Sequence, residues 1–292
     1  MRYNGRMQHP IIFYHGSCPD GFGGAYAAWK KFGDAAEYVP LARGGEPLPD
    51  VSGREVYFID FILTQPEMDA IAAQASRLVA LDHHAGVQEV TESMPEHVFD
   101  NDRSGATIAW NYFHPGTPVP ELLSIIEDDD LFRFALPDTR AVLSYIAIKP
   151  YSFEEWDELA KLLQDPQGRE DFLRKVHTYA EYFELLAQHA VDHAKLVSFE
   201  GHEVYFATAH PFKPMKSLVG NLLARKQGPF SLVVAAHPKG YGVSIRGDGT
   251  FDVSEIARKY GGNGHKSSSG FLIPAGVPVP WTQIEHDDAA RD

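Results

Sequence analysis

The sequence has almost no cysteine, no long apolar run and too few basic residues to balance its acidic ones. One of its 292 residues is a cysteine, Cys18, which excludes an internal disulfide and is typical of a reducing compartment. No segment reaches the roughly 20 consecutive apolar residues of a membrane span. The residues before Pro10 also lack the apolar core of a signal peptide. We therefore expect a cytoplasmic protein with no membrane partner.

The charge balance restricts the partners. Lys and Arg number 26 against 40 Asp and Glu, a formal net charge of −14. Proteins that bind duplex nucleic acid are usually basic on the binding face, so we expect no extended duplex binding. A small phosphorylated substrate is compatible with this charge, because bound cations and a few basic residues can overcome a distant negative field.

Three short apolar runs each end in a carboxylate or a histidine. They run into His15, into Asp60 and into the triplet Asp82-His83-His84. Short runs rich in β-branched and aromatic residues predict buried strands of a parallel sheet, and ligands bind beyond the carboxyl ends of such strands. Oxygen and imidazole donors gathered at one sheet edge are the ligands that a divalent metal ion needs.

The order of apolar runs and helical patterns predicts an α/β fold with an N-terminal, doubly wound, mainly parallel sheet. Residues 20–24 are expected to form a glycine-rich turn before the first helix. A helical connector and a smaller C-terminal α+β domain should follow, with the active site in the cleft between the domains. The expected boundaries are 8–150 for a metal-binding domain, 151–196 for the connector, 197–276 for a substrate-binding domain and 277–292 for a tail.

Further candidate ligands accompany the strand ends. Asp20 follows His15, and an acidic run at the end of a helical pattern offers Asp128 as first choice and Asp130 as second. Cys18 is either a soft ligand or a small loop residue, and the preference of hard ions for oxygen favours the loop residue. Carboxylates shared by two ions would give a two-metal site suited to phosphoryl chemistry.

A second motif, far along the chain, predicts a phosphate-binding loop. Residues 261–270 read Gly-Gly-Asn-Gly-His-Lys-Ser-Ser-Ser-Gly, and successive amides in such a loop can form an anion-binding nest. Arg246 follows a predicted strand and can hold a phosphate by two hydrogen bonds. A flexible loop beside a surface arginine is the alternative. The candidate phosphate ligands here are Arg246, Gly262, Gly264, His265 and Lys266.

Together these residues resemble the DHH phosphoesterase superfamily with its C-terminal DHH-associated domain. Its members include nano-RNA hydrolases, RecJ-type exonucleases, cyclic-dinucleotide phosphodiesterases and family II inorganic pyrophosphatases. The resemblance spans about residues 11–275 and rests on the triplet, on the glycine motif and on Arg246. The helix start at Ser104 also resembles a family feature, which adds Ser104 to the candidate phosphate ligands.

The resemblance implies two divalent ions, Mn²⁺ or Mg²⁺ in its place. Cys18 stands where the family pattern has an aspartate, which implies weaker or different ligation of one ion. His84 would contact the scissile phosphate or orient a ligand, within a catalytic triplet that also contains Asp82. The implied metal ligands are His15, Asp20, Asp60, His83 and Asp128, with Asp130 as the second choice and Cys18 as a less favoured addition.

We therefore expect a metal-dependent phosphodiesterase, a hydrolase of the nuclease type. It would convert short oligonucleotides, or cyclic or linear dinucleotides, to mononucleotides with water activated by two metals. One alternative is a phosphoanhydride hydrolase acting on pyrophosphate or polyphosphate. Another is a non-catalytic nucleotide-binding module, which the cysteine at position 18 favours. The sequence leaves open the base, the cleavage polarity, the physiological metal and whether the chain forms a homodimer.

Overall fold

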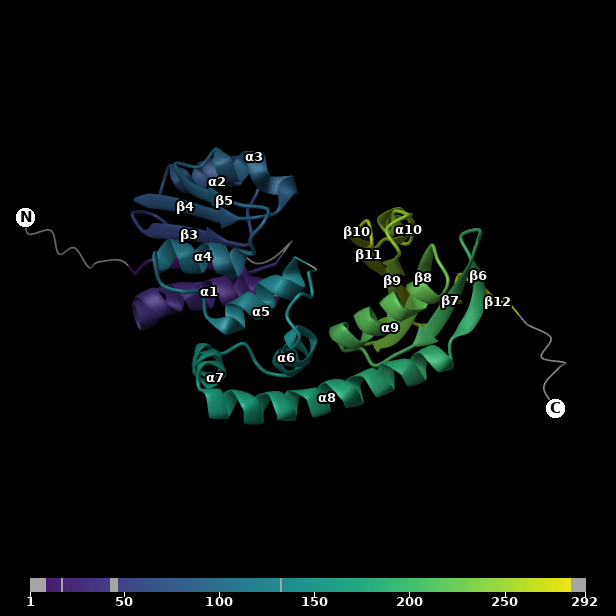
Figure 1. Ribbon diagram of the computed structural model, residues 1–292. Helices are drawn as coiled ribbons and strands as arrows, with labels where there is room; N and C mark the ends of the chain where they lie inside the picture. Colours follow the sequence, from purple (N-terminus) through teal and green to yellow (C-terminus); the bar gives the residue numbers. More distant parts are fainter. Residues whose placement is uncertain (1–8, 17, 43–46, 132, 285–292) are drawn as a thin grey trace, which may run out of the picture. The chain divides into compact units, whose positions relative to one another are not determined.

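The computed structural model describes residues 9–16, 18–42, 47–131 and 133–284. They divide into two compact units, the first ending at Thr178 and the second beginning at Tyr179. The boundary lies inside α8 (Pro166–Asp192), a helix of 27 residues (Figure 1). Among the described helices, none combines the length and the apolar composition needed to cross a lipid bilayer.

The first unit is built on a five-stranded parallel sheet with the order β2-β1-β3-β4-β5. The predicted doubly wound sheet is thereby confirmed. Because β2 and β3 flank β1 on opposite sides, the strand order reverses at β1 and β3, the point where such sheets bind ligands. The strands are β1 (Ile11–His15), β2 (Glu37–Leu41), β3 (Glu55–Ile59), β4 (Arg77–Asp82) and β5 (Glu96–Phe99).

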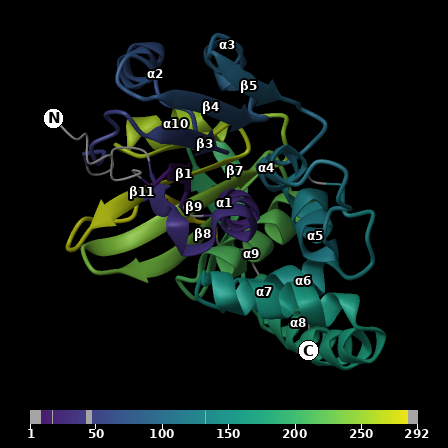
Figure 2. The same cartoon turned by 90° about the vertical axis from the view of Figure 1, so that its left-hand side faces the viewer.

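Helices cover both faces of this sheet, with α2 and α3 on one face and α1 and α4 on the other (Figures 1 and 2). Alternate strand residues face the two layers: Phe13 and Phe58 pack with Met68 of α2, whereas Tyr57 meets Phe113 of α4. The bounds are α1 (Pro19–Phe32), η1 (Gly33–Ala35), α2 (Gln65–Ala72), η2 (Ala85–Val87), α3 (Gln88–Glu92), α4 (Gly105–Phe113), α5 (Glu121–Asp130), α6 (Thr139–Ile146) and α7 (Phe153–Gln164).

The expected glycine-rich turn at residues 20–24 is instead the beginning of α1. Glycine is a poor helix former, but close packing outweighs its propensity here. A Cβ on Gly23 would lie 2.8 Å from Cβ of Ala106, and one on Gly24 would lie 2.3 Å from a methyl group of Ile59. The glycines therefore let α1 approach α4 and the sheet closely.

The second unit contains a seven-stranded sheet with the order β10-β11-β9-β8-β7-β6-β12, in which only the β7–β8 pair is parallel. Val233 packs under α9 on one face, and Leu232 packs under α10 on the other. This confirms the predicted smaller α+β part. Its elements are β6 (Lys195–Phe199), β7 (His202–Thr208), α9 (Lys213–Lys226), β8 (Phe230–His237), β9 (Gly240–Gly247), α10 (Val253–Lys259), β10 (Asn263–His265), β11 (Ser268–Pro274) and β12 (Thr282–Gln283).

Two stretches of the second unit differ from the expectations. The glycine motif is a hairpin between β10 and β11, with Asn263 opposite Gly270. The expected tail contains β12, which pairs antiparallel with β6, and the N–H of Ile284 donates to the carbonyl of Leu196. The neighbouring Trp281 packs against the core, and burial of this large apolar side chain holds the segment in place.

Candidate metal centre

Asp60 lies at the middle of the candidate site, at the end of β3. Its Oδ2 lies 3.3 Å from Sγ of Cys18 and 3.4 Å from Nδ1 of His15. Its Oδ1 lies 3.3 Å from Nε2 of His83 and 3.5 Å from Nδ1 of His84. The three strand ends thus meet as the sequence predicted, and the two oxygens of one carboxylate face two different groups of donors.

The donor atoms at this site form two sets. The first, called the cysteine set, contains His15, Cys18 and Asp60, and the second, called the carboxylate set, contains Asp20, His83 and Asp130. In the carboxylate set, Nε2 of His83 lies 3.8 Å from Oδ2 of Asp20 and 3.5 Å from Oδ2 of Asp130. Within each set the donor atoms lie within 4.8 Å of one another, as do those of Asp60, His83 and His84. Each set is therefore a candidate ion position.

The backbone has two unusual features beside the carboxylates of Asp60 and Asp20. Asp60 adopts a left-handed conformation with φ 57°, which is uncommon for a residue other than glycine and is often found at functional sites. A Cβ on Gly105 would lie 2.7 Å from Cβ of Asp60 and 2.9 Å from Oδ2 of Asp20. Glycine at position 105 is therefore needed for α4 to approach both acids. The sequence showed this glycine only as part of a helix start.

Ser104 begins α4 and is fully buried. Its hydroxyl accepts the N–H of Thr107 at 3.4 Å, and its own N–H donates to Oε2 of Glu127 at 3.1 Å. This is the role of a helix cap. The expectation that Ser104 binds a substrate phosphate is not supported, because the side chain is enclosed within the first unit.

The structure reverses the preference between two acids of α5. The carboxylate of Asp128 accepts the N–H groups of Ala135 at 2.8 Å and Leu136 at 3.1 Å, and also the hydroxyl of Thr139. These bonds fix the chain before α6, and Asp128 lies in none of the candidate donor groups found among the described residues. Asp130, the second choice, is the one that lies beside His83.

Asp82 positions the two histidines that follow it. Its Oδ1 accepts the backbone N–H groups of His83 and His84, both at 2.7 Å, and lies 2.8 Å from Nδ1 of His84. The carboxylate is fully buried at the end of β4. Through Oδ1 it fixes the backbone of the triplet and the ring of His84, so Asp82 is a positioning residue, while its Oδ2 has no hydrogen-bond partner.

The acids and histidines shift one another's pKa values. Burial and the charges of Asp60 and Asp130 raise the pKa of Asp20. Burial opposes ionisation of Asp60, but the nearby imidazoles of His15 and His83 outweigh it and lower the Asp60 pKa to about 2. Burial likewise disfavours the charged form of His83, yet the surrounding carboxylates raise its pKa to about 9. The cluster therefore favours positive charge at its centre.

The residues present fit a divalent ion. In the described part of the chain, three buried side-chain atoms of this cluster have no hydrogen-bond partner: Oδ1 of Asp60, Oδ2 of Asp82 and Nε2 of His83. Buried polar atoms rarely lack partners. Carboxylate oxygens and imidazole nitrogens converging in this way are suitable ligands for Mn²⁺ or Mg²⁺.

The second unit holds a buried arginine, Arg246, at the end of β9. Its Nη2 donates to Oγ of Ser217 at 2.8 Å and its Nη1 to the carbonyl of Ile245 at 3.0 Å, and burial lowers its pKa. Among the described residues no carboxylate pairs with it. A buried cation without a counter-ion is costly, so this site favours an anion. Lys266 is exposed in the turn between β10 and β11, and the side chain of His265 lies outside the described part.

The backbone N–H groups of Gly262 and Gly264, which were expected to bind an anion, form hydrogen bonds within the second unit. The N–H of Gly262 donates to the carbonyl of Ala257, and that of Gly264 donates to Oδ1 of Asn263, both at 2.8 Å. A Cβ on Gly262 would lie 2.1 Å from the carbonyl oxygen of Gly270. Both amides already have partners, and the absence of a side chain at position 262 permits the close approach of the hairpin strands. The structure therefore does not support the nest.

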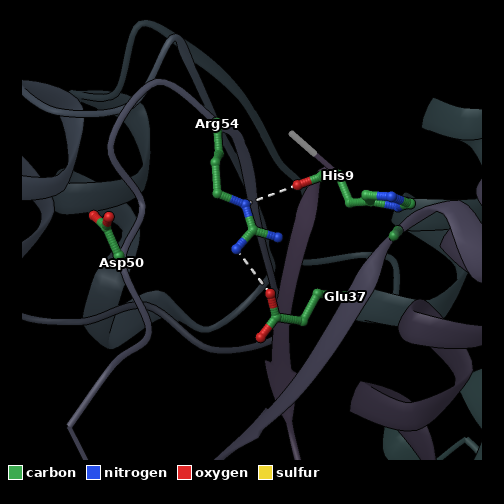
Figure 3. Close-up of a pocket in the computed structure, with 5 residues that line it drawn as sticks. His9, Glu37, Asp50 and Arg54 are labelled. Carbon is green, nitrogen blue, oxygen red and sulfur yellow. Dashed lines mark hydrogen bonds and ion pairs between the residues drawn. The ribbon is translucent and has the colours of Figure 1, made fainter. Parts of the chain in front are cut away.

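A pocket of about 410 Å³ opens at the opposite edge of the first sheet (Figure 3). It lies by the amino ends of β2 and β3, away from the strand ends that carry the candidate ligands. Arg54 donates from Nε to the carbonyl of His9 and pairs through Nη1 with Oε2 of Glu37, both at 2.8 Å. The guanidinium of Arg54, which lines this pocket, therefore already has two partners.

No protein-family model matches the sequence. The chain is 26% identical over 304 residues to the uncharacterized protein R106 of Acanthamoeba polyphaga mimivirus, covering 95% of this chain and 71% of that protein. It is similar in structure to the DHH domain of a member of the s1p family of ribosomal proteins, with a TM-score of 0.54 and 15% identity over 94% of this chain and 83% of the other. The chain has a DHH-type fold.

A second solved structure agrees with this assignment of fold. It is the pGpG-specific phosphodiesterase PggH of Vibrio cholerae, with a TM-score of 0.54 and 12% identity over 91% of this chain and 94% of that one. The expected resemblance to DHH proteins is thus confirmed for the fold. In this DHH-type fold the triplet Asp82-His83-His84 stands at the end of β4, beside the ends of β1 and β3.

Proposed function

We propose that this protein is a metal-dependent phosphodiesterase that hydrolyses short oligonucleotides or dinucleotides to mononucleotides. The observation that carries the proposal is the position of Asp60, with one oxygen toward the cysteine set and the other toward His83 of the carboxylate set. Adjacent ion positions that share a carboxylate are suited to two-metal phosphoryl transfer. The similarity to a pGpG-specific phosphodiesterase supports the same substrate class.

When bound, two divalent ions would activate water and offset the charge that develops on the phosphate oxygens. The chain's own residues hold and orient the reacting groups. Asp82 binds Nδ1 of His84, which leaves Nε2 of that half-exposed ring for a phosphate oxygen. Asp20 is fixed by the N–H groups of Gly105 and Ala106, so its carboxylate is preorganised for an ion.

The second unit would supply a contact to a terminal phosphate. Arg246 is buried and lacks a carboxylate partner among the described residues, and Ser217 holds its guanidinium in place. A phosphate would provide the missing counter-ion. With a net charge of −14 for the chain, such a local contact suits a short substrate better than a long duplex.

The test is hydrolysis of the 5′-phosphorylated dinucleotide pGpG by the purified protein with Mn²⁺, with mononucleotide release followed by chromatography. We expect release by the wild type and none by Asp60→Asn, a change that retains a side chain suited to the left-handed backbone. Asp69→Asn is the matched control, because this exposed acid lies on α2, on the face of the sheet away from α1 and α4.

Parallel assays separate the other functions. Orthophosphate released from pyrophosphate or polyphosphate, with the dinucleotide intact, would replace the proposal with a phosphoanhydride hydrolase. Tight dinucleotide binding by calorimetry without turnover in Mn²⁺ or Mg²⁺ would replace it with a nucleotide-binding module.

A further inference from the structure

The chain's one cysteine lies inside the candidate metal centre. Sγ of Cys18 is 3.1 Å from Nδ1 of His15 and 3.3 Å from Oδ2 of Asp60. The cysteine set therefore offers nitrogen, sulfur and oxygen, whereas the carboxylate set offers one nitrogen and oxygens from two acids. The two candidate positions differ in chemistry although they are adjacent.

The spacing in the cysteine set suits a small tetrahedral ion. Zn²⁺ binds thiolate sulfur at about 2.3 Å and imidazole nitrogen or carboxylate oxygen at about 2.0–2.2 Å, which separates tetrahedral ligand atoms by roughly 3.3–3.6 Å. The three donor–donor distances here are 3.1, 3.3 and 3.4 Å. Small adjustments would bring the three atoms onto one ion.

The start of α1 fixes the position of the sulfur. Cys18 is the N-cap of α1, and its Sγ accepts the N–H of Gly21 at 3.3 Å. Burial and the charge of Asp60 raise the pKa of the free thiol, an effect that a metal ion bound to the sulfur would counteract. The side chain is also partly exposed, which gives an ion access to it.

We propose that the cysteine set binds a thiophilic divalent ion such as Zn²⁺, while the carboxylate set binds Mn²⁺ or Mg²⁺. Soft thiolate ligands select ions of the zinc type, and oxygen ligands select the harder ions. The centre would then hold two different metals. This inference rests on the metal centre of the proposed function, but it concerns which ion binds and not which substrate is cut. On binding, the thiol proton of Cys18 passes to solvent and the metal takes its place.

Cobalt spectroscopy tests the sulfur ligand directly. Co²⁺ bound to a thiolate shows an intense near-ultraviolet charge-transfer band, and Cys18 is the one thiol in the sequence. We expect this band when Co²⁺ is added to the metal-free full chain, and we expect it to be lost in Cys18→Ser. Serine is a good N-cap, so this variant should keep α1 folded, which far-ultraviolet circular dichroism checks.

Competition and a control variant complete the experiment. Zn²⁺ in slight excess should abolish the band, whereas the same excess of Mn²⁺ or Mg²⁺ should leave it. Asp130→Asn should keep the band, because Asp130 belongs to the carboxylate set. Cys18→Ser should weaken Zn²⁺ binding by at least about 10–100-fold, the loss seen even for outer partners of metal ligands. Cys18→Asp should shift the preference of this position toward Mn²⁺.

Three results would overturn the proposal. They are Co²⁺ bound by the folded wild type without a charge-transfer band, displacement of Co²⁺ by Mg²⁺ as readily as by Zn²⁺, and unchanged Zn²⁺ affinity in folded Cys18→Ser. None of these readouts depends on turnover. A band without dinucleotide hydrolysis would therefore refute the proposed function alone, and hydrolysis without a band would refute this proposal alone.

Discussion

The backbone N–H of Gly105 donates to Oδ2 of Asp20 at 2.7 Å. This bond joins the amino end of α4 to an acid of α1, and the N–H of Ala106 adds a second bond to Oδ1 at 3.0 Å. A carboxylate at a helix amino end is favourable because it meets unsatisfied N–H groups. Asp20, a candidate metal ligand, is therefore fixed by the start of a helix that contributes no candidate ligand of its own.

Gly105→Ala should weaken metal binding. Alanine normally stabilises a helix relative to glycine by about 1 kcal/mol. Here the new methyl group would meet Asp60 and Asp20 at less than 3 Å, so we expect a loss of about 1–3 kcal/mol in stability and a 10–100-fold loss in Mn²⁺ affinity. Calorimetric titration with Mn²⁺ and urea unfolding measure the two effects. Gly86→Ala, where the methyl group meets nothing within 4 Å, is the control and should change neither.

Asp130→Asn and Asp128→Asn should separate metal binding from folding. An ion at 100 times its Kd stabilises the folded state by about 2.7 kcal/mol, and a chelator removes this gain. Asp130→Asn should lose most of the Mn²⁺-dependent rise in melting temperature. Asp128→Asn should keep that rise but melt earlier in EDTA, because it weakens bonds to Ala135, Leu136 and Thr139, with a cost of about 1–3 kcal/mol. The opposite pattern would restore Asp128 as the ligand.

Arg246→Gln should weaken substrate binding more than the chemical step. Hydrogen bonds to charged groups contribute about 1.5–3 kcal/mol, which corresponds to a rise in KM of roughly 10–100-fold with kcat little changed. Steady-state kinetics with the 5′-phosphorylated dinucleotide measure both constants. Arg174→Gln, at an exposed arginine of α8, should leave both unchanged. A fall in kcat at constant KM would contradict a role for Arg246 in binding.

Asp157→Asn should destabilise the protein near neutral pH but not in acid. Burial opposes ionisation of Asp157, but bonds from Lys161, Lys30 and Tyr26 outweigh it and lower its pKa to about 2. Because an unfolded aspartate has a pKa near 3.9, the ionised form contributes about 2 kcal/mol above that pH, and this is lost as the pH falls toward 2. The stability gap between variant and wild type in urea should therefore narrow from pH 7 to pH 3. Glu158→Gln, an exposed neighbour, should show a small gap at every pH.

The sequence predicted the sheet and the ligands at its strand ends because each is encoded locally. A run of β-branched and aromatic residues forms a strand, and the next residue stands at the sheet edge. The choice between Asp128 and Asp130 is not local. Successive residues of a helix point about 100° apart, so the packing of α5 decides which acid faces His83. Sequence reasoning also placed a turn at Gly23 and Gly24, because it could not see the neighbours Ala106 and Ile59 that make glycine favourable there.

Contacts that the sequence does not reveal also explain why the glycine motif of the second unit was interpreted wrongly as an anion nest. Gly262 and Gly264 predicted exposed amides, yet their N–H groups are bonded within the unit. Glycine permits both a nest and a tight hairpin, and only the pairing of β10 with β11 distinguishes them. Arg246 was predicted to follow a strand, but it lies within β9, and its burial against Ser217 depends on α9, which is distant in sequence.

The sulfur of Cys18 has two roles, since it accepts the N–H of Gly21 at the start of α1 and also faces His15 and Asp60. Aspartate, serine and asparagine can also cap a helix, so the helix tolerates exchange at this position. Under the proposed assignment of Zn²⁺ to the cysteine set, exchange of this single residue would change the preferred ion and leave the architecture intact.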